Sequence, residues 1–190
     1  MRRWEIIQLL INKYNLKSYI EIGVHNRECY DKIQCEVKQC VDPNFPATWQ
    51  MTSDEYFKQH ASFNDIYFID GLHTLDQTYK DLVNASHYLN RGGFIVVHDC
   101  SPLTEWHTRP AEEYKRGQEW NGTTFLGYIK FKEERFDLDC YVVDTDYGCG
   151  VITERVKPEK RVVTWGYFDE NRERILNLVS VDTFKHNLEQ

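Results

Sequence analysis

The chain has 190 residues, of which 41% are hydrophobic and 14% aromatic, so its length suits one domain with a sizeable core. Its formal net charge of -7 argues against a broad phosphate-binding surface, and so against nucleic acid as a partner. No run approaches the roughly 20 apolar residues that a membrane span needs, and the N-terminus predicts an amphipathic helix rather than a signal sequence. We therefore expect no membrane partner and a cytoplasmic location.

The first predicted elements are a helix and the beginning of a sheet. Residues 3–15 place apolar side chains on one helical face. Residues 19–23 predict a short strand, and residues 26–33 predict a helix directly after it. Residues 38–43 predict a second strand, which a proline ends. Ser53 can cap the short helix that follows.

Residues 65–73 form the stretch around which the rest of the chain is organised. A run of apolar and aromatic residues ends there in Asp70-Gly-x-His73. This pattern predicts a buried strand that delivers a carboxylate and an imidazole to its C-terminal edge. Ligands bind at that edge in open α/β sheets.

A helix and a second strand of the same design follow. Thr74 and Gln77 have capping-box spacing, apolar residues then recur at helical intervals, and residues 90–93 carry a helix-ending Gly-Gly signal. The strand at residues 94–97 ends in His-Asp. A crossover helix between two parallel strands places their ends together, so four ionisable groups are expected at one edge. They are Asp70, His73, His98 and Asp99.

The C-terminal part predicts a loop, a hairpin and two helices. Residues 101–121 contain two prolines and two tryptophans without periodicity, which is typical of a functional lid or binding wall. Residues 123–132 predict a helix. Residues 136–143 and 149–153 predict an antiparallel hairpin at the sheet edge, and residues 169–179 a last helix. The whole pattern predicts an α/β fold with a Rossmann-like, doubly wound, mostly parallel sheet.

The six cysteines contain no Cys-x-x-Cys pair, and a chain with a good core needs no disulfide framework. We expect most of them to be small buried hydrophobic residues. Cys100 follows Asp99 at the edge of the predicted site, where a nucleophilic role would require a lowered thiol pKa.

The first two strands carry the signals of a nucleoside site. Glu21-x-Gly23 and then Asp42 have the spacing of nucleotide-binding folds, in which the second acid bonds ribose hydroxyls. A dinucleotide site would prefer Gly-x-Gly-x-x-Gly, because the backbone must approach a pyrophosphate. Residues 23–28 have no second or third glycine. A ligand with ribose and a cationic amino-acid tail therefore fits better.

Four motifs in order resemble those of a class I S-adenosylmethionine-dependent methyltransferase. They are Tyr-Ile-Glu-Ile-Gly at 19–23, Val-Asp-Pro at 41–43, Phe-Ile-Asp-Gly-Leu-His at 68–73 and Val-His-Asp-Cys at 97–100. More narrowly, they are similar to the branch typified by macrocin-type sugar O-methyltransferases and cephalosporin-hydroxylase-like proteins. The resemblance covers roughly residues 18–153.

The resemblance implies one methyltransferase-like domain over residues 1–190. Its parts would be an N-terminal helix at 1–17, the core at 18–153 and a C-terminal cap at 154–190. It also implies S-adenosylmethionine as the cofactor and a small molecule as the methyl acceptor, and it allows a homo-oligomer.

The same resemblance implies roles for individual residues. Glu21 and Gly23 would flank the methionine part of the cofactor, Asp42 would hold the ribose hydroxyls and Ser53 would lie near the adenine. Arg27 departs from the branch, whose members often carry a small residue there. The cofactor-binding residues implied are Glu21, Gly23, His25, Asp42, Ser53 and Asp70.

The chemistry implied is methyl transfer from a sulfonium to a hydroxyl, which is too weak an acid to react unaided at neutral pH. His73, beside Asp70, is the predicted general base. A divalent cation held by Asp70, His98 and Asp99 would also lower the pKa of the hydroxyl. Metal-dependent members usually carry another acid at the position of His98, so the histidine favours manganese or iron over magnesium.

Two functions from different classes remain open. The leading one is an O-methyltransferase acting on a sugar-like or other small hydroxylated acceptor. The alternative is a non-catalytic nucleoside-cofactor-binding protein of the same fold in a glycan or secondary-metabolite pathway. A nicotinamide oxidoreductase is disfavoured, because the glycine fingerprint is missing.

Overall fold

The computed structural model describes residues 1–115, 117–155, 164–176, 178 and 180–181. The chain divides into two compact units, Met1–Arg155 and Val156–Gln190. In the second unit, the described helix is α5 (Trp165–Leu176), which begins four residues before the predicted start. Most of the remaining residues of the predicted cap lie outside the described ones, so the cap stays a prediction.

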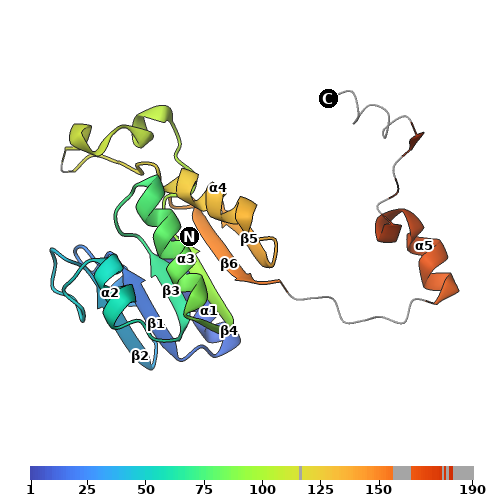
Figure 1. The fold of residues 1–190 in the computed structure, drawn as a ribbon, viewed down its shortest axis with the longest axis horizontal. Coiled ribbons are helices and arrows are strands. Elements are labelled where there is room, and N and C mark those ends of the chain that lie inside the picture. The colour runs from blue at the N-terminus through green and yellow to red at the C-terminus, as the bar shows by residue number, and fades with distance from the viewer. Residues whose placement is uncertain (116, 156–163, 177, 179, 182–190) are drawn as a thin grey trace. The chain divides into compact units, whose positions relative to one another are not determined.

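The described residues of the first unit form one six-stranded sheet of order β2-β1-β3-β4-β6-β5 (Figure 1). Neighbouring strands among β1 to β4 pair in parallel, and β6 is antiparallel to both β4 and β5. The predicted α/β sheet with an antiparallel hairpin at its edge is therefore confirmed. The strands are β1 (Ser18–Ile22), β2 (Val37–Val41), β3 (Asn64–Ile69), β4 (Leu89–Val97), β5 (Leu138–Val143) and β6 (Cys149–Glu154).

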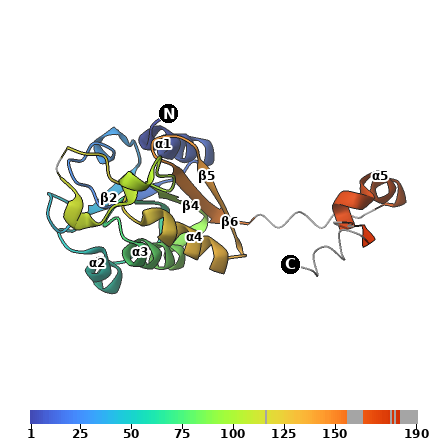
Figure 2. The same cartoon turned by 90° about the horizontal axis from the view of Figure 1, so that it is seen from above.

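Helices cover both faces of this sheet, as the view in Figure 2 shows. One face packs on α1 (Arg3–Tyr14) and the segment 24–33. The opposite face packs on α2 (Ser53–Gln59), α3 (Leu75–His87) and α4 (Thr124–Glu134). Because both faces are covered, β3 and the end of β4 read as continuous apolar runs rather than alternating ones. Among the described helices, none is both long and apolar enough to span a membrane.

The predicted helix at residues 26–33 is wrong. His25 has φ 41° and Arg27 has φ 64°, and these left-handed conformations interrupt a right-handed helix. The helical structure that remains there is one 3-10 turn, Tyr30–Lys32. The segment after β1 therefore crosses the sheet mostly as an irregular loop.

Two predicted helix boundaries also differ. Thr52, not Ser53, caps α2, because its hydroxyl accepts from the Glu55 amide at 3.2 Å while the Glu55 carboxylate accepts from the Thr52 amide at 2.9 Å. Helix α3 ends at His87 rather than at residues 90–93. The two glycines serve β4 instead, since a Cβ at Gly93 would lie 2.5 Å from the Asp65 carbonyl oxygen.

Gly23, just after β1, lies against the backbone of Asp70, just after β3. We therefore predict that a side chain at position 23 would clash with that backbone. A Cβ at Gly23 would lie 2.3 Å from the Asp70 carbonyl oxygen, and φ is +85°. Gly92 has φ +77° with nothing within 4 Å of such a Cβ. Both Gly→Ala variants should lose about 1–2 kcal/mol of unfolding free energy to the left-handed backbone, and Gly23→Ala roughly 1–3 kcal/mol more to overpacking. Equal losses in urea unfolding would contradict the close approach.

Candidate functional site

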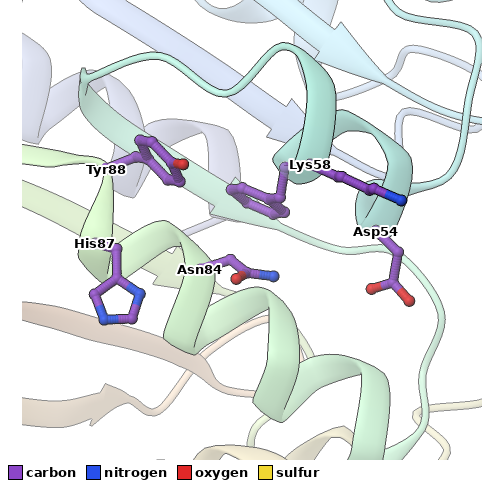
Figure 3. Close-up of a pocket in the computed structure, with 6 residues that line it drawn as sticks. Asp54, Lys58, Asn84, His87 and Tyr88 are labelled. Atoms are coloured by element: carbon purple, nitrogen blue, oxygen red, sulfur yellow. The ribbon is translucent and has the colours of Figure 1, made fainter.

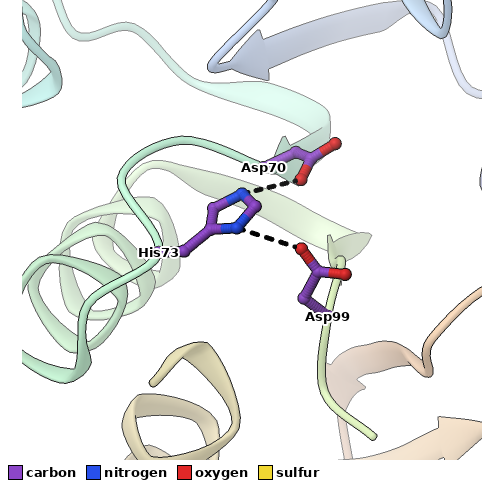
Figure 4. A group of neighbouring side chains, drawn as sticks. All are labelled: Asp70, His73 and Asp99. Carbon is purple, nitrogen blue, oxygen red and sulfur yellow. Dashed lines mark ion pairs between the residues drawn. The ribbon is translucent and has the colours of Figure 1, made fainter. Parts of the chain in front are cut away.

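The ends of β3 and β4 bring together three of the predicted residues (Figure 4). Asp70 directly follows β3, His73 lies just before α3, and Asp99 follows β4. The His73 ring lies between the two carboxylates, with Nε2 3.4 Å from Asp70 Oδ1 and Nδ1 3.2 Å from Asp99 Oδ2. Burial by itself would lower the pKa of His73, but the hydrogen bond to Asp70 and the charges of Asp99 and Asp70 outweigh it and raise the pKa.

His98 occupies the other side of the same two carboxylates. Its Nδ1 lies 3.3 Å from Asp70 Oδ1 and 3.1 Å from Asp99 Oδ1, and its Nε2 lies 3.5 Å from Asp146 Oδ2. Burial would lower the pKa of His98, yet the charge of Asp70 and the bonds to its carboxylate partners raise it well above the ordinary value. With both ring nitrogens facing carboxylates, His98 is placed as an imidazolium counter-ion.

Asp146 is a member of the cluster that sequence reasoning missed. It lies in the turn between β5 and β6 with φ 50°, and its side chain is 2% exposed. One oxygen accepts from the backbone amide of Arg3 at 3.0 Å, and the other accepts from the Arg2 guanidinium at 2.9 Å. Burial would raise the pKa of Asp146, but the bonds from His98, the Arg3 amide and Arg2 lower it. The sequence shows only a turn there, so no local signal marks this carboxylate.

The described residues of the 101–121 segment lie beyond the ends of the parallel strands (Figure 1). The Trp120 ring stacks on His73, with centroids 5.2 Å apart and planes 15° apart. The Asn121 side-chain amide donates to Asp99, and the Thr123 backbone amide donates to the His73 carbonyl oxygen at 2.9 Å. The predicted wall therefore contacts the ionisable groups directly, and Asn121 is a second residue that sequence reasoning missed.

Glu21, the predicted acid beside the methionine part, is 2% exposed. Its carboxylate accepts from the Tyr19 hydroxyl, on the face of the sheet covered by α1. Burial raises the pKa of Glu21 to about 8, against a smaller lowering by the Tyr19 bond. Glu21 is therefore mostly protonated at neutral pH.

Asp42, the predicted ribose ligand, is 6% exposed and organises the surrounding loops. One carboxylate oxygen accepts from the amides of Val24 and His25, both at 3.0 Å. The other accepts from the amides of Asn44 and Phe45, at 2.8 and 3.0 Å. All four lone-pair positions of the carboxylate are thus used by backbone amides.

Ser53 lies in a different polar network. Its hydroxyl accepts from the Gln77 side-chain amide at 3.0 Å, which also donates to Asp81 at 3.0 Å. An open groove of about 350 Å³ lies nearby between α2 and α3, and its described lining contains none of the predicted site residues (Figure 3). The structure therefore places Ser53 at the start of α2, bonded to Gln77 of α3.

Cys100 does not have the character of a nucleophile. Burial raises the pKa of its thiol to about 12, so at neutral pH the sulfur is a neutral thiol. It is also one of six cysteines that are all free.

The donor types at the strand ends fit a divalent cation. Asp70, His73 and Asp99 each offer a ligand atom, and these atoms lie within 4.8 Å of one another. The buried Nδ1 of His73 has no hydrogen-bond partner, although it lies near Asp99. One imidazole and two carboxylates suit manganese or iron. The sequence predicts Asp70, His98 and Asp99 as the metal ligands, whereas the group that the structure brings together contains His73 instead of His98.

The fold and this site agree with a sequence match. Residues 20–100 match a family described as a methyltransferase domain. No curated protein is similar enough in sequence to count as a match. The matched segment contains the motifs at 41–43, 68–73 and 97–100 and most of the motif at 19–23, so it agrees with the resemblance to class I S-adenosylmethionine-dependent methyltransferases.

Solved structures of the same fold include three methyltransferases. An O-methyltransferase from Bacillus cereus in complex with SAH is 11% identical, with TM-score 0.56 and 79% of each chain covered. The O-methyltransferase TomG from Streptomyces achromogenes, in complex with SAM, is 13% identical, with TM-score 0.56 and 80% of this chain and 79% of that chain covered. MycE, in complex with Mg, SAH and mycinamycin VI, is 15% identical, with TM-score 0.55 and 85% of this chain and 51% of that chain covered.

The four amide bonds to Asp42 predict a loss of stability on its removal. Asp42→Ala should lower the free energy of unfolding by about 2–3 kcal/mol, because buried amides lose a charged acceptor. Asp42→Asn keeps one acceptor oxygen and should lose less. Denaturant unfolding checks both variants. Unchanged stability with weakened SAH binding would instead indicate that the carboxylate serves the ribose alone.

The raised pKa of Glu21 predicts a pH dependence of stability. Its ordinary pKa is 4.5 and its folded pKa is about 8, so between these values the native state keeps a proton that the unfolded state has released. Stability is therefore complete below pH 4.5 and falls as pH rises to 8, by up to roughly 1.4 kcal/mol per pH unit. Glu21→Gln cannot titrate and should lack this fall. Parallel stability–pH curves for the two proteins would contradict the buried, protonated Glu21.

Proposed function

We propose that the protein transfers a methyl group from S-adenosylmethionine to the hydroxyl oxygen of a small, sugar-like acceptor. The observation that carries this proposal is the imidazole of His73, held between Asp70 and Asp99 at the ends of adjacent strands in a methyltransferase fold. A positioned imidazole at a ligand-binding edge is what a weakly acidic hydroxyl requires. The proposal also draws on the two O-methyltransferases of this fold that bind SAH or SAM.

In this proposal His73 accepts the proton of the acceptor hydroxyl. When bound, the cofactor supplies a methyl group activated by a sulfonium. Asp70 and Asp99 orient the imidazole and stabilise the imidazolium that forms, and Trp120 limits rotation of the ring by stacking on it. The acceptor oxygen is thereby relieved of its proton as it forms its new bond to carbon.

For the cofactor we propose the edge that Gly23 and Asp70 form, with Glu21 beneath it. Asp42 can reach ribose hydroxyls only if the Val24 and His25 amides release one of its oxygens, because all four acceptor positions are used. His25 lies against Phe45 with ring centroids 4.7 Å apart. Opening of the turn at His25 would therefore accompany ribose binding.

A divalent cation is a second way to activate the hydroxyl. Asp70, His73 and Asp99 would hold it, and it would lower the pKa of the acceptor hydroxyl. The MycE structure contains Mg. Such a role would occupy a His73 nitrogen, so the cation and the free base are competing assignments.

The acceptor proposal rests on the 101–121 wall and on the neighbours. MycE binds mycinamycin VI, and the wall of this chain presents Trp120 to the site. We propose a small-molecule acceptor and a cytoplasmic protein, and we leave self-association to measurement. The alternative is a protein that binds the cofactor without turnover.

The test is methyl transfer from methyl-labelled S-adenosylmethionine to a panel of sugars, nucleotide sugars and catechols. His73→Gln should lower the rate about 10²–10⁴-fold, because it removes the general base. SAH affinity by titration calorimetry should change little, and His87→Gln, an exposed histidine of α3, should behave as wild type.

Adding a chelator distinguishes the two proposed ways of activating the acceptor hydroxyl, by His73 as a base or by a divalent cation. Full activity in EDTA with an inactive His73→Gln supports the base, whereas loss in EDTA and recovery with manganese supports the cation. Binding of SAH with no transfer to any acceptor would favour the non-catalytic alternative.

A further inference from the structure

Arg3 brings a buried cation to the candidate site from the first turn of α1. Its side chain is 18% exposed. One part of it is fastened, because Nη1 donates to Asp146 Oδ2 at 3.1 Å and the Arg3 backbone amide donates to the same oxygen at 3.0 Å. The guanidinium is therefore held in a fixed position at the edge where the parallel strands end.

The other edge of this guanidinium is formed by Nε and Nη2. Nε is buried and has no hydrogen-bond partner. It lies 3.6 Å from Asp70 Oδ2, and Nη2 lies 3.8 Å from Glu28 Oε2, both beyond hydrogen-bond distance. The Nε and Nη2 hydrogens point in parallel and match the two oxygens of a carboxylate. Nε and Nη2 of Arg3 thus form a bidentate fork that has ion-pair contacts with Asp70 and Glu28 but no hydrogen bond to either.

The surroundings of the fork define the ligand chemistry. Asp70 and Glu28 border it with negative charge, so a simple anion would be repelled by two carboxylates. A zwitterion matches the arrangement, since its carboxylate can pair with Arg3 while its ammonium group faces Asp70 or Glu28. The fork also lies beside Asp70, whose backbone Gly23 approaches closely.

We propose that Arg3 is the receptor for the α-carboxylate of the cofactor's amino-acid tail, with Asp70 and Glu28 facing the α-ammonium group. This assignment rests on the proposed function, because S-adenosylmethionine carries such a tail. The bonds to Asp146 leave the Nε edge without a hydrogen bond, and the ion pairs of that edge with Asp70 and Glu28 are longer than a hydrogen bond. A purely structural role for Arg3 would not distinguish a ligand with an amino-acid tail from one without it.

The experiment compares two ligands that differ in the tail alone. SAH has the amino-acid tail, and 5′-methylthioadenosine has the same adenine, ribose and thioether without it. Titration calorimetry measures both with wild type, Arg3→Gln, Arg3→Lys and Arg2→Gln. Arg2 is the matched control, since it bonds Asp146 at 2.9 Å with a side chain that is 63% exposed.

Arg3→Gln should weaken SAH binding roughly 10- to 100-fold and leave 5′-methylthioadenosine unchanged, because one charge-assisted fork is lost. Arg3→Lys keeps the charge near Asp146 but not the fork, so it should also weaken SAH selectively, and it serves if Arg3→Gln does not fold. Arg2→Gln should affect neither ligand.

Two outcomes would overturn the assignment. Equal weakening of both ligands by the Arg3 variants, or no weakening of SAH, would leave Arg3 with a structural role only. Failure of wild type to bind SAH at all would remove the proposed function, and with it the tail that Arg3 is assigned to hold.

Discussion

The site depends on one electrostatic constraint, the meeting of three carboxylates around His98. Asp70, Asp99 and Asp146 each lie within 3.5 Å of a His98 nitrogen. Like charges this close and this poorly exposed repel one another unless a cation lies between them. His98 and Arg3 supply that cation, so α1, the ends of β3 and β4 and the β5–β6 turn are held by the same balance of charge.

Backbone strain collects at the same edge of the sheet. Asp99, Asp146 and Tyr147 have φ values of 61°, 50° and 61°, and none of them is glycine. Each such conformation costs on the order of 1–3 kcal/mol and persists only where the surroundings determine it. Two of the three carry carboxylates of the cluster. The strain therefore serves to aim side chains that a relaxed turn would direct elsewhere.

The sequence predicts the parts of the site that follow from sheet direction, and it misses the parts that depend on tertiary position. Parallel strands place all their carboxyl ends together, so the meeting of Asp70 with Asp99 follows from the strand pattern alone. Asp146 reaches the cluster only because β6 inserts between β4 and β5 in reverse direction. Arg3 reaches it only through the packing of α1. The helix predicted at 26–33 fails because its start requires left-handed backbone, which periodicity does not report.

The balance of charge also bears on how a hydroxyl would be activated. Asp70, Asp99 and Asp146 face three cations, His98, Arg3 and Arg2, and the first two carboxylates also lie directly against His73. A proton transferred to His73 would bring positive charge between Asp70 and Asp99, and these neighbouring carboxylates would make the imidazole a stronger base than it would be alone. A divalent cation bound by Asp70 and Asp99 would instead overcompensate the carboxylates unless His98 lost its proton. Metal binding and a protonated His98 therefore oppose each other, and the geometry of His98, with both nitrogens on carboxylates, favours the base.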